Sequence, residues 1–202
     1  MKYGNDLTRT ESRRICIFLL HIAVVAGIAV GAAIVAAKKD TDLSGEWWLH
    51  QYFAPAYSGN TVLAVFRNTF VSSAVQLVLI MLLGFFSLGQ PFGAALLVYR
   101  GVGIGASVAS MYMISGAGSL LPILVLVVPK AIILSYISVL GVREAFRLSA
   151  VQLRFLFRDE LPEAKMKRAV KLYFVKFLVL AAIIMLVSAA DSVMNYIFMD
   201  LY

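Results

Sequence analysis

The stretch "LGQPFGAALLVYRGVGIGASVASMY", residues 88–112, decides the fold class of this chain. It is an apolar run spaced by glycines, and it is longer than the roughly 20 residues that an α-helix needs to cross the hydrocarbon core of a bilayer. Arg100 lies inside this run. The cation needs an explanation, because a charge near the bilayer centre costs at least about 2.5–3.5 kcal/mol on insertion scales.

The composition of the chain agrees with a bilayer environment. Hydrophobic residues make up 61% of the 202 positions and charged residues 14%, values that soluble globular domains rarely reach. The net charge of +7 would suggest nucleic acid in a soluble protein. Here we expect membrane lipids and no nucleic acid around the chain, so the placement of its cations is more informative than their number.

Five apolar runs are long enough to span a membrane. We therefore expect one all-α, polytopic membrane domain over residues 1–202. The predicted spans cover residues 15–37, 70–88, 91–115, 120–141 and 173–198. The first run exceeds the roughly 7 to 15 apolar residues of a secretory signal, so we interpret it as a span.

Lysine and arginine residues predict the orientation, because such residues near span ends stay on the cytoplasmic side. An inside N-terminus places most of them inside, whereas the outer segments hold only Lys38, Lys39 and Arg67. Five crossings then put the C-terminus outside. The expected location is the bacterial cell membrane.

Two longer connections have a composition of their own. The predicted outer loop, residues 38–68, is rich in aromatic residues, which favour the membrane–water boundary or a partner surface: Trp47, Trp48, Tyr52, Phe53 and Tyr57. The predicted inner segment, residues 142–172, carries a basic stripe at near-helical spacing: Arg143, Arg147, Arg154 and Arg158. For this inner segment we expect an amphipathic helix on the anionic inner leaflet.

Residues that could carry catalysis or hold a metal are sparse. His21 and His50 have no second histidine or cysteine at metal-ligand spacing, and Cys16 is the single cysteine. The motif "GVGIG" at residues 101–105 does not match G-x-G-x-x-G and lies within a predicted span. We therefore expect no enzyme activity, no metal and no cofactor.

Small residues at four-residue spacing indicate close helix packing inside the bilayer. They form three groups: Gly27 with Gly31, Gly89 with Gly93, and Gly101 with Gly105 and Ala109. Each group would let the backbone of a neighbouring helix approach.

Arg100 and Lys130 are the two cations far from the ends of predicted spans. Counted from the starts of their spans, both lie near the midplane at comparable depth, where they would repel each other. Asp191 is expected too close to the outer end of its span to reach them. Compensation is therefore sought from opened carbonyls near Pro129, water, Gln76, a lipid phosphate or the carboxylate of a partner. Structural, partner-binding and anion-binding roles all stay open.

Four passages together resemble the stage II sporulation protein M family. They are "QYFAPAYSGNT" (51–61), "FRNTFVSS" (66–73), "LLGFFSLGQPFGAALLVYRGVGIGASVA" (82–109) and "LPILVLVVPKAIILSYISVLG" (121–141). The most specific features are the hairpin with Gly89 and Pro91, followed by Arg100, Gly101 and Gly105, and the break at Pro129 and Lys130.

The resemblance implies a non-enzymatic membrane scaffold. Such a protein would anchor a cell-wall amidase and a lytic transglycosylase at the septum during engulfment of the forespore. The alternative is a transporter, or the membrane subunit of an export complex, with Arg100 and Lys130 along the path of an anionic substrate. The sequence leaves the oligomeric state open, including a homo-oligomer.

Overall fold

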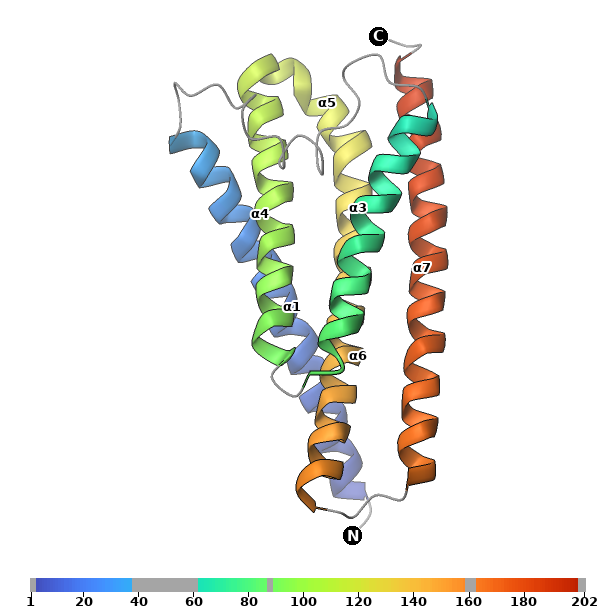
Figure 1. The fold of residues 1–202 in the computed structure, drawn as a ribbon. Helices are drawn as coiled ribbons and strands as arrows, with labels where there is room; N and C mark the ends of the chain where they lie inside the picture. Colours follow the sequence, from blue (N-terminus) through green and yellow to red (C-terminus); the bar gives the residue numbers. More distant parts are fainter. Residues whose placement is uncertain (1–2, 38–61, 87–88, 159–162, 200–202) are drawn as a thin grey trace.

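Every element of the computed structural model is helical over the residues that it describes, 3–37, 62–86, 89–158 and 163–199 (Figure 1). The long helices are α1 (Tyr3–Ala37), α3 (Val62–Leu83), α4 (Gly89–Ser115), α6 (Val128–Arg158) and α7 (Glu163–Met199). Between α4 and α6 lie a 3-10 turn, η2 (Gly116–Ser119), the short α5 (Leu120–Pro122) and a π-helical turn, η3 (Ile123–Val127).

Five of these helices are long and apolar enough to cross a membrane, within residues 14–37, 62–83, 91–113, 123–153 and 166–197. This confirms the predicted all-α fold with five membrane-spanning helices. The direction in which the bundle crosses the membrane stays a prediction.

Several helix ends differ from the expected ones. The second span begins at Val62 and ends at Leu83, because residues 62–69 continue the helix and a turn follows at Gly84. The inner segment is not a separate helix over its first half, since α6 runs without a break to Arg158. Most of the predicted outer loop, residues 38–61, lies outside the described residues, and so do its five aromatic residues.

The long helices form two pairs joined through α6 (Figure 1). Helix α1 packs mainly on α4, and α3 packs mainly on α7, whereas α6 contacts both pairs. Direct contact between α3 and α4 is slight. The two pairs therefore meet chiefly on α6.

The apolar core follows the same arrangement. The buried side chains of α6 form its centre, among them Ile137, Val139 and Val142, and they meet Leu77 and Ile80 of α3 and Phe177 and Leu180 of α7. Large apolar side chains on the outer faces of all five helices are exposed. That is the expected arrangement for helices surrounded by lipid, where exposed apolar surface carries no penalty.

The end of α3 is fixed by hydrogen bonds from the other helices. Tyr173 Oη of α7 donates to the Met81 carbonyl at 2.9 Å, and Ser149 Oγ of α6 donates to the Phe86 carbonyl at 3.1 Å. The Met81 carbonyl belongs to the last turn of α3, whose carbonyls have no partner within the helix, and the Phe86 carbonyl belongs to the turn that follows α3. These bonds hold α3 against α6 and α7.

Glycines allow the backbones of α1 and α4 to approach each other closely. A Cβ placed on Gly27, Gly31, Gly101 or Gly105 would overlap backbone atoms of the facing helix. Gly93 faces the side chains of Phe146 and Val142 on α6 instead. The surroundings of Gly89 are not described. Ala109 is half-buried on α4.

We predict that Gly105→Ala destabilises the bundle. The added methyl group would overlap the Ile28 carbonyl of α1, and overpacking of this kind costs about 1–3 kcal/mol. The gain in helix propensity from glycine to alanine, about 1 kcal/mol, offsets only part of this cost. Thermal unfolding of the purified protein in nanodiscs should show a lower melting temperature.

Gly118→Ala is the matched control, because nothing lies within 4 Å of a Cβ at that position. Equal melting temperatures for the two variants would show that α1 and α4 do not need their close approach.

Candidate functional site

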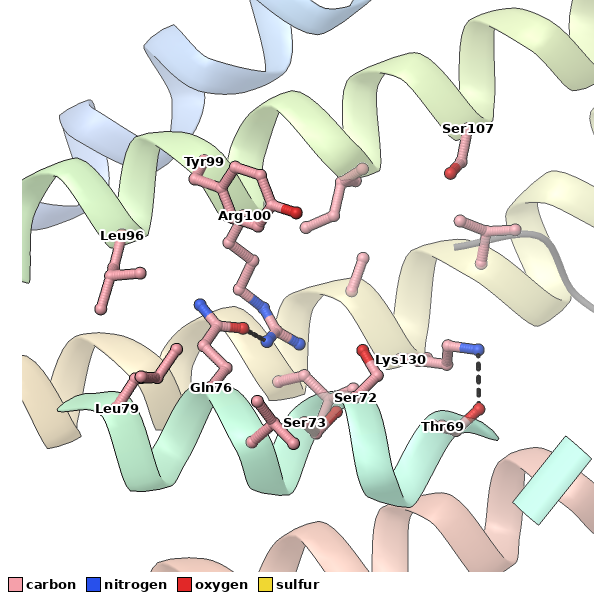
Figure 2. A pocket seen from close by; sticks show the side chains of 15 residues that line it. Thr69, Ser72, Ser73, Gln76, Leu79, Leu96, Tyr99, Arg100, Ser107 and Lys130 are labelled. Carbon is pink, nitrogen blue, oxygen red and sulfur yellow. Dashed lines mark hydrogen bonds between the residues drawn. The ribbon is translucent and has the colours of Figure 1, made fainter. Parts of the chain in front are cut away.

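The polar side chains inside the bundle gather where α3, α4 and α6 face one another (Figure 2). Helix α6 reaches this place through an unusual start, since the π-helical turn η3 precedes it and Pro129 lies in its first turn. The helix continues from η3 into α6 without a break, so the missing N–H of Pro129 removes one backbone hydrogen bond of the continuous helix. A π-helical turn changes the direction of the following side chains and is frequent at functional sites. Lys130 follows directly and points toward α3 (Figure 2).

Lys130 forms an ion pair with Asp191 of α7. Its Nζ lies 2.8 Å from Asp191 Oδ2 and 3.4 Å from Thr69 Oγ1 of α3. Thr69 Oγ1 also donates to the same carboxylate oxygen at 2.8 Å, and Asn195 Nδ2 lies 3.2 Å from Oδ1. The Asp191 side chain is only 2% exposed. Donors on three helices therefore meet at one buried carboxylate.

This ion pair corrects two expectations from the sequence. Asp191 does reach Lys130, so Lys130 is neutralised within the chain. The two cations also do not share one depth, because Lys130 contacts Thr69 whereas Arg100 contacts Gln76. Thr69 and Gln76 lie two turns apart on α3, which separates them by about 10 Å along the helix axis.

Arg100 has a different environment from Lys130. It is 7% exposed, and its Nη1 donates to Gln76 Oε1, the one amide that the sequence had offered as a partner. Within the described part of the chain, Arg100 Nε and Gln76 Nε2 have no hydrogen-bond partner. A neutral amide leaves the guanidinium charge uncompensated.

No acidic residue of the membrane-spanning segments remains for Arg100. These segments contain only Glu144 and Asp191 as acidic residues. Asp191 is bound to Lys130, and Glu144 Oε2 lies 2.6 Å from Lys176 Nζ. Arg100 is thus a buried cation without a counter-ion among the described residues.

A cavity of about 170 Å³ adjoins Arg100 and Lys130. Its polar lining comes mainly from α3 and α4, with Thr69, Ser72, Ser73, Gln76, Tyr99 and Ser107 beside the two cations (Figure 2). Val75, Leu79 and Tyr99 also line it, and each is about half exposed. These three side chains mark a mouth between α3 and α4, on the lateral surface of the bundle.

The basic stripe is partly balanced by an acid that the sequence reading overlooked. Arg143 Nη2 lies 3.7 Å from Glu144 Oε1, and Arg147 Nη1 lies 4.0 Å from Glu144 Oε2. Arg154 and Arg158 belong to the last turns of α6, but their side chains lie outside the description.

The described residues contain no group of three or more histidine, cysteine, aspartate or glutamate side chains that could hold a metal ion. His21 Nδ1 lies 2.8 Å from the Ile17 carbonyl, one turn earlier on α1. Arg100 and Gln76 place a positive charge and hydrogen-bond donors beside the cavity, a combination that can bind a hydrogen-bond acceptor or an anion.

The family model of "Stage II sporulation protein M" matches residues 17–190 of the 202. The chain belongs to this family. No curated protein and no solved structure shows a significant match. The stage II sporulation protein M family is generally not a catalytic one, and the five apolar helices make this member a multi-pass membrane protein.

We predict that Lys130 and Asp191 stabilise the bundle jointly, so that losing either one alone costs more than its share of losing both. Lys130→Met leaves a buried carboxylate and Asp191→Asn leaves a buried ammonium group, and breaking a buried pair from one side costs about 3–5 kcal/mol. The double variant leaves neither charge and should be clearly less destabilised than the sum of the two single losses. Melting temperatures of the four proteins in nanodiscs measure this coupling.

Lys171→Met, at an exposed position of α7, controls for the loss of one lysine. Strictly additive losses for Lys130→Met and Asp191→Asn would contradict the ion pair.

Proposed function

We propose that this chain is a non-enzymatic membrane scaffold that holds peptidoglycan-degrading enzymes at the septum during forespore engulfment. Membership of the stage II sporulation protein M family supports the sporulation role. The expected partners are a cell-wall amidase and a lytic transglycosylase. Both would act on the outer side of the membrane, where the predicted orientation places the outer loop, residues 38–68, and the C-terminus.

The observation that carries this proposal is the uncompensated cation at Arg100. The same bundle neutralises Lys130 and Lys176 with its own carboxylates. A buried charge left without a counter-ion is costly, so intramembrane charges of this kind usually mark an interaction. In a scaffold that binds membrane-anchored partners, a partner would supply the interaction that Arg100 lacks.

The cavity favours a second candidate, the transport of an anionic substrate. Its lining with Arg100 and Lys130 is what a transport path would need. The ion pair to Asp191 weakens this alternative, because only Arg100 remains to attract an anion. Uptake of a labelled anion into proteoliposomes, lost in an Arg100→Met variant, would favour transport over scaffolding.

We predict that the tagged chain, cross-linked in sporulating cells, co-isolates a wall amidase and a transglycosylase. Arg100→Met should accumulate in the membrane normally, because removing a buried charge removes an insertion cost. It should nevertheless fail to complement a deletion strain. Arg100→Lys should retain part of the function, since a point charge remains although the planar guanidinium geometry is lost.

Membrane abundance measured beside complementation separates loss of function from loss of protein, and Lys171→Met serves as a charge-matched control. Isolation of the chain without any wall hydrolase, or full complementation by Arg100→Met, would count against the scaffold.

A further inference from the structure

The cavity beside Arg100 is suited to bind a group that accepts hydrogen bonds. Arg100 Nε and Gln76 Nε2 are buried donors, and neither has an acceptor among the described residues. Both side chains line the cavity, and they are joined by the hydrogen bond from Arg100 Nη1 to Gln76 Oε1 (Figure 2). An unsatisfied buried donor is destabilising, so these two donors call for a group that accepts hydrogen bonds.

A carboxylate satisfies both donors and the charge together. It has two oxygens, accepts hydrogen bonds only, and pairs strongly with a guanidinium group. Water would satisfy the N–H groups, and the cavity is large enough to hold it, but water leaves the positive charge of Arg100 without a counter-ion.

The depth of the site indicates what carries the carboxylate. Arg100 is eleven residues from the start of α4 at Gly89, which places it about 16 Å along the helix. A lipid phosphate would have to leave the headgroup region and cross about half of the hydrocarbon core, roughly 15 Å, to reach it. A carboxylate on a transmembrane helix arrives at that depth with its own helix.

The mouth of the cavity fits a helix as well. Val75 and Leu79 lie one turn apart on the exposed face of α3, and Tyr99 lies opposite on α4. An apolar helix crossing this mouth would pack against these side chains while one acidic residue entered between them. A second copy of the chain does not supply that residue, because the acids of its spans, Glu144 and Asp191, are already paired.

We propose that the Arg100 cavity binds an aspartate or glutamate in the middle of a transmembrane helix of a partner protein. The proposal rests on the scaffold function and adds the means of recognition. Arg100 would bind the carboxylate of the partner within the bilayer, at a fixed depth, through the gap between α3 and α4. The partner is then held by its membrane anchor, whatever contacts form outside.

The test uses the full chain in phosphatidylcholine nanodiscs with synthetic single-span peptides of leucine and alanine. One peptide carries glutamate at its centre, a second carries glutamine there, and a third carries glutamate two turns nearer one end. Energy transfer from a donor at Leu82→Cys, in a Cys16→Ser background, reports binding. Leu82 is exposed and does not line the cavity.

The central glutamate peptide should bind about fivefold or more tightly than the other two, within the range found for interhelical polar contacts in bilayers. Arg100→Met should abolish this preference, and Lys171→Met should keep it. Gln76→Leu, which removes one donor and leaves the cation, should reduce the preference without abolishing it. Melting temperatures exclude any variant that no longer folds.

Equal binding of the glutamate and glutamine peptides would overturn the proposal, and so would a preference that survives Arg100→Met. A preference that vanishes when phosphatidylglycerol is added, by an Arg100-dependent competition, would assign the site to a lipid phosphate instead. No wall hydrolase takes part in this assay. Failure to co-isolate hydrolases from cells would therefore reject the proposed partners and leave the site standing, whereas equal binding of the peptides would reject the site alone.

Discussion

A charge within a bilayer is costly unless a counter-ion lies beside it, and Asp191 supplies that counter-ion for Lys130. Its carboxylate also accepts from Thr69 and Asn195, so one buried group draws together α3, α6 and α7. Lipid provides no hydrophobic force that would press these helices together. A shared polar centre and the packing around it therefore hold this half of the bundle.

The other half of the bundle is held in a different way. Helices α1 and α4 approach until their glycines touch the facing backbone, and this contact requires Gly27, Gly31, Gly101 and Gly105. Helix α6 then joins the two halves. Contact between α3 and α4 is slight, and the hydrogen bond from Arg100 to Gln76 joins them where the cavity lies. Arg100 thus lies between two well-packed halves without a counter-ion among the described residues, which suits a bundle that receives a helix from outside.

The five spans could be predicted because an apolar run of sufficient length has few other uses. Gln76 could be named as a partner of Arg100, and the glycine spacing pointed to the helices that approach closely. The counter-ion of Lys130 was missed because its depth was counted along a straight α-helix from residue 120. The chain instead forms the 3-10 turn η2, the short α5 and the π-helical turn η3 before α6 begins. Such turns change rise and register and leave little trace in hydropathy.

Thr69 was missed for a related reason. The predicted span began only at residue 70 and so left out Thr69, whereas α3 begins at Val62 and brings Thr69 to Asp191. Glu144 was overlooked among its basic neighbours, although it contacts Lys176 across α6 and α7. In each case a long-range pairing between helices decided the role of a single polar residue, and local sequence does not encode such a pairing.

The most direct test of this account is to exchange the two charges of the central ion pair. Thermal unfolding in nanodiscs would compare Lys130→Asp, Asp191→Lys and the protein that carries both changes. If opposite charges at these two positions hold α6 to α7, each single change places like charges together and should unfold far below the unchanged protein. The exchanged pair should then recover most of the lost melting temperature. An exchanged protein no more stable than the single variants would contradict the account.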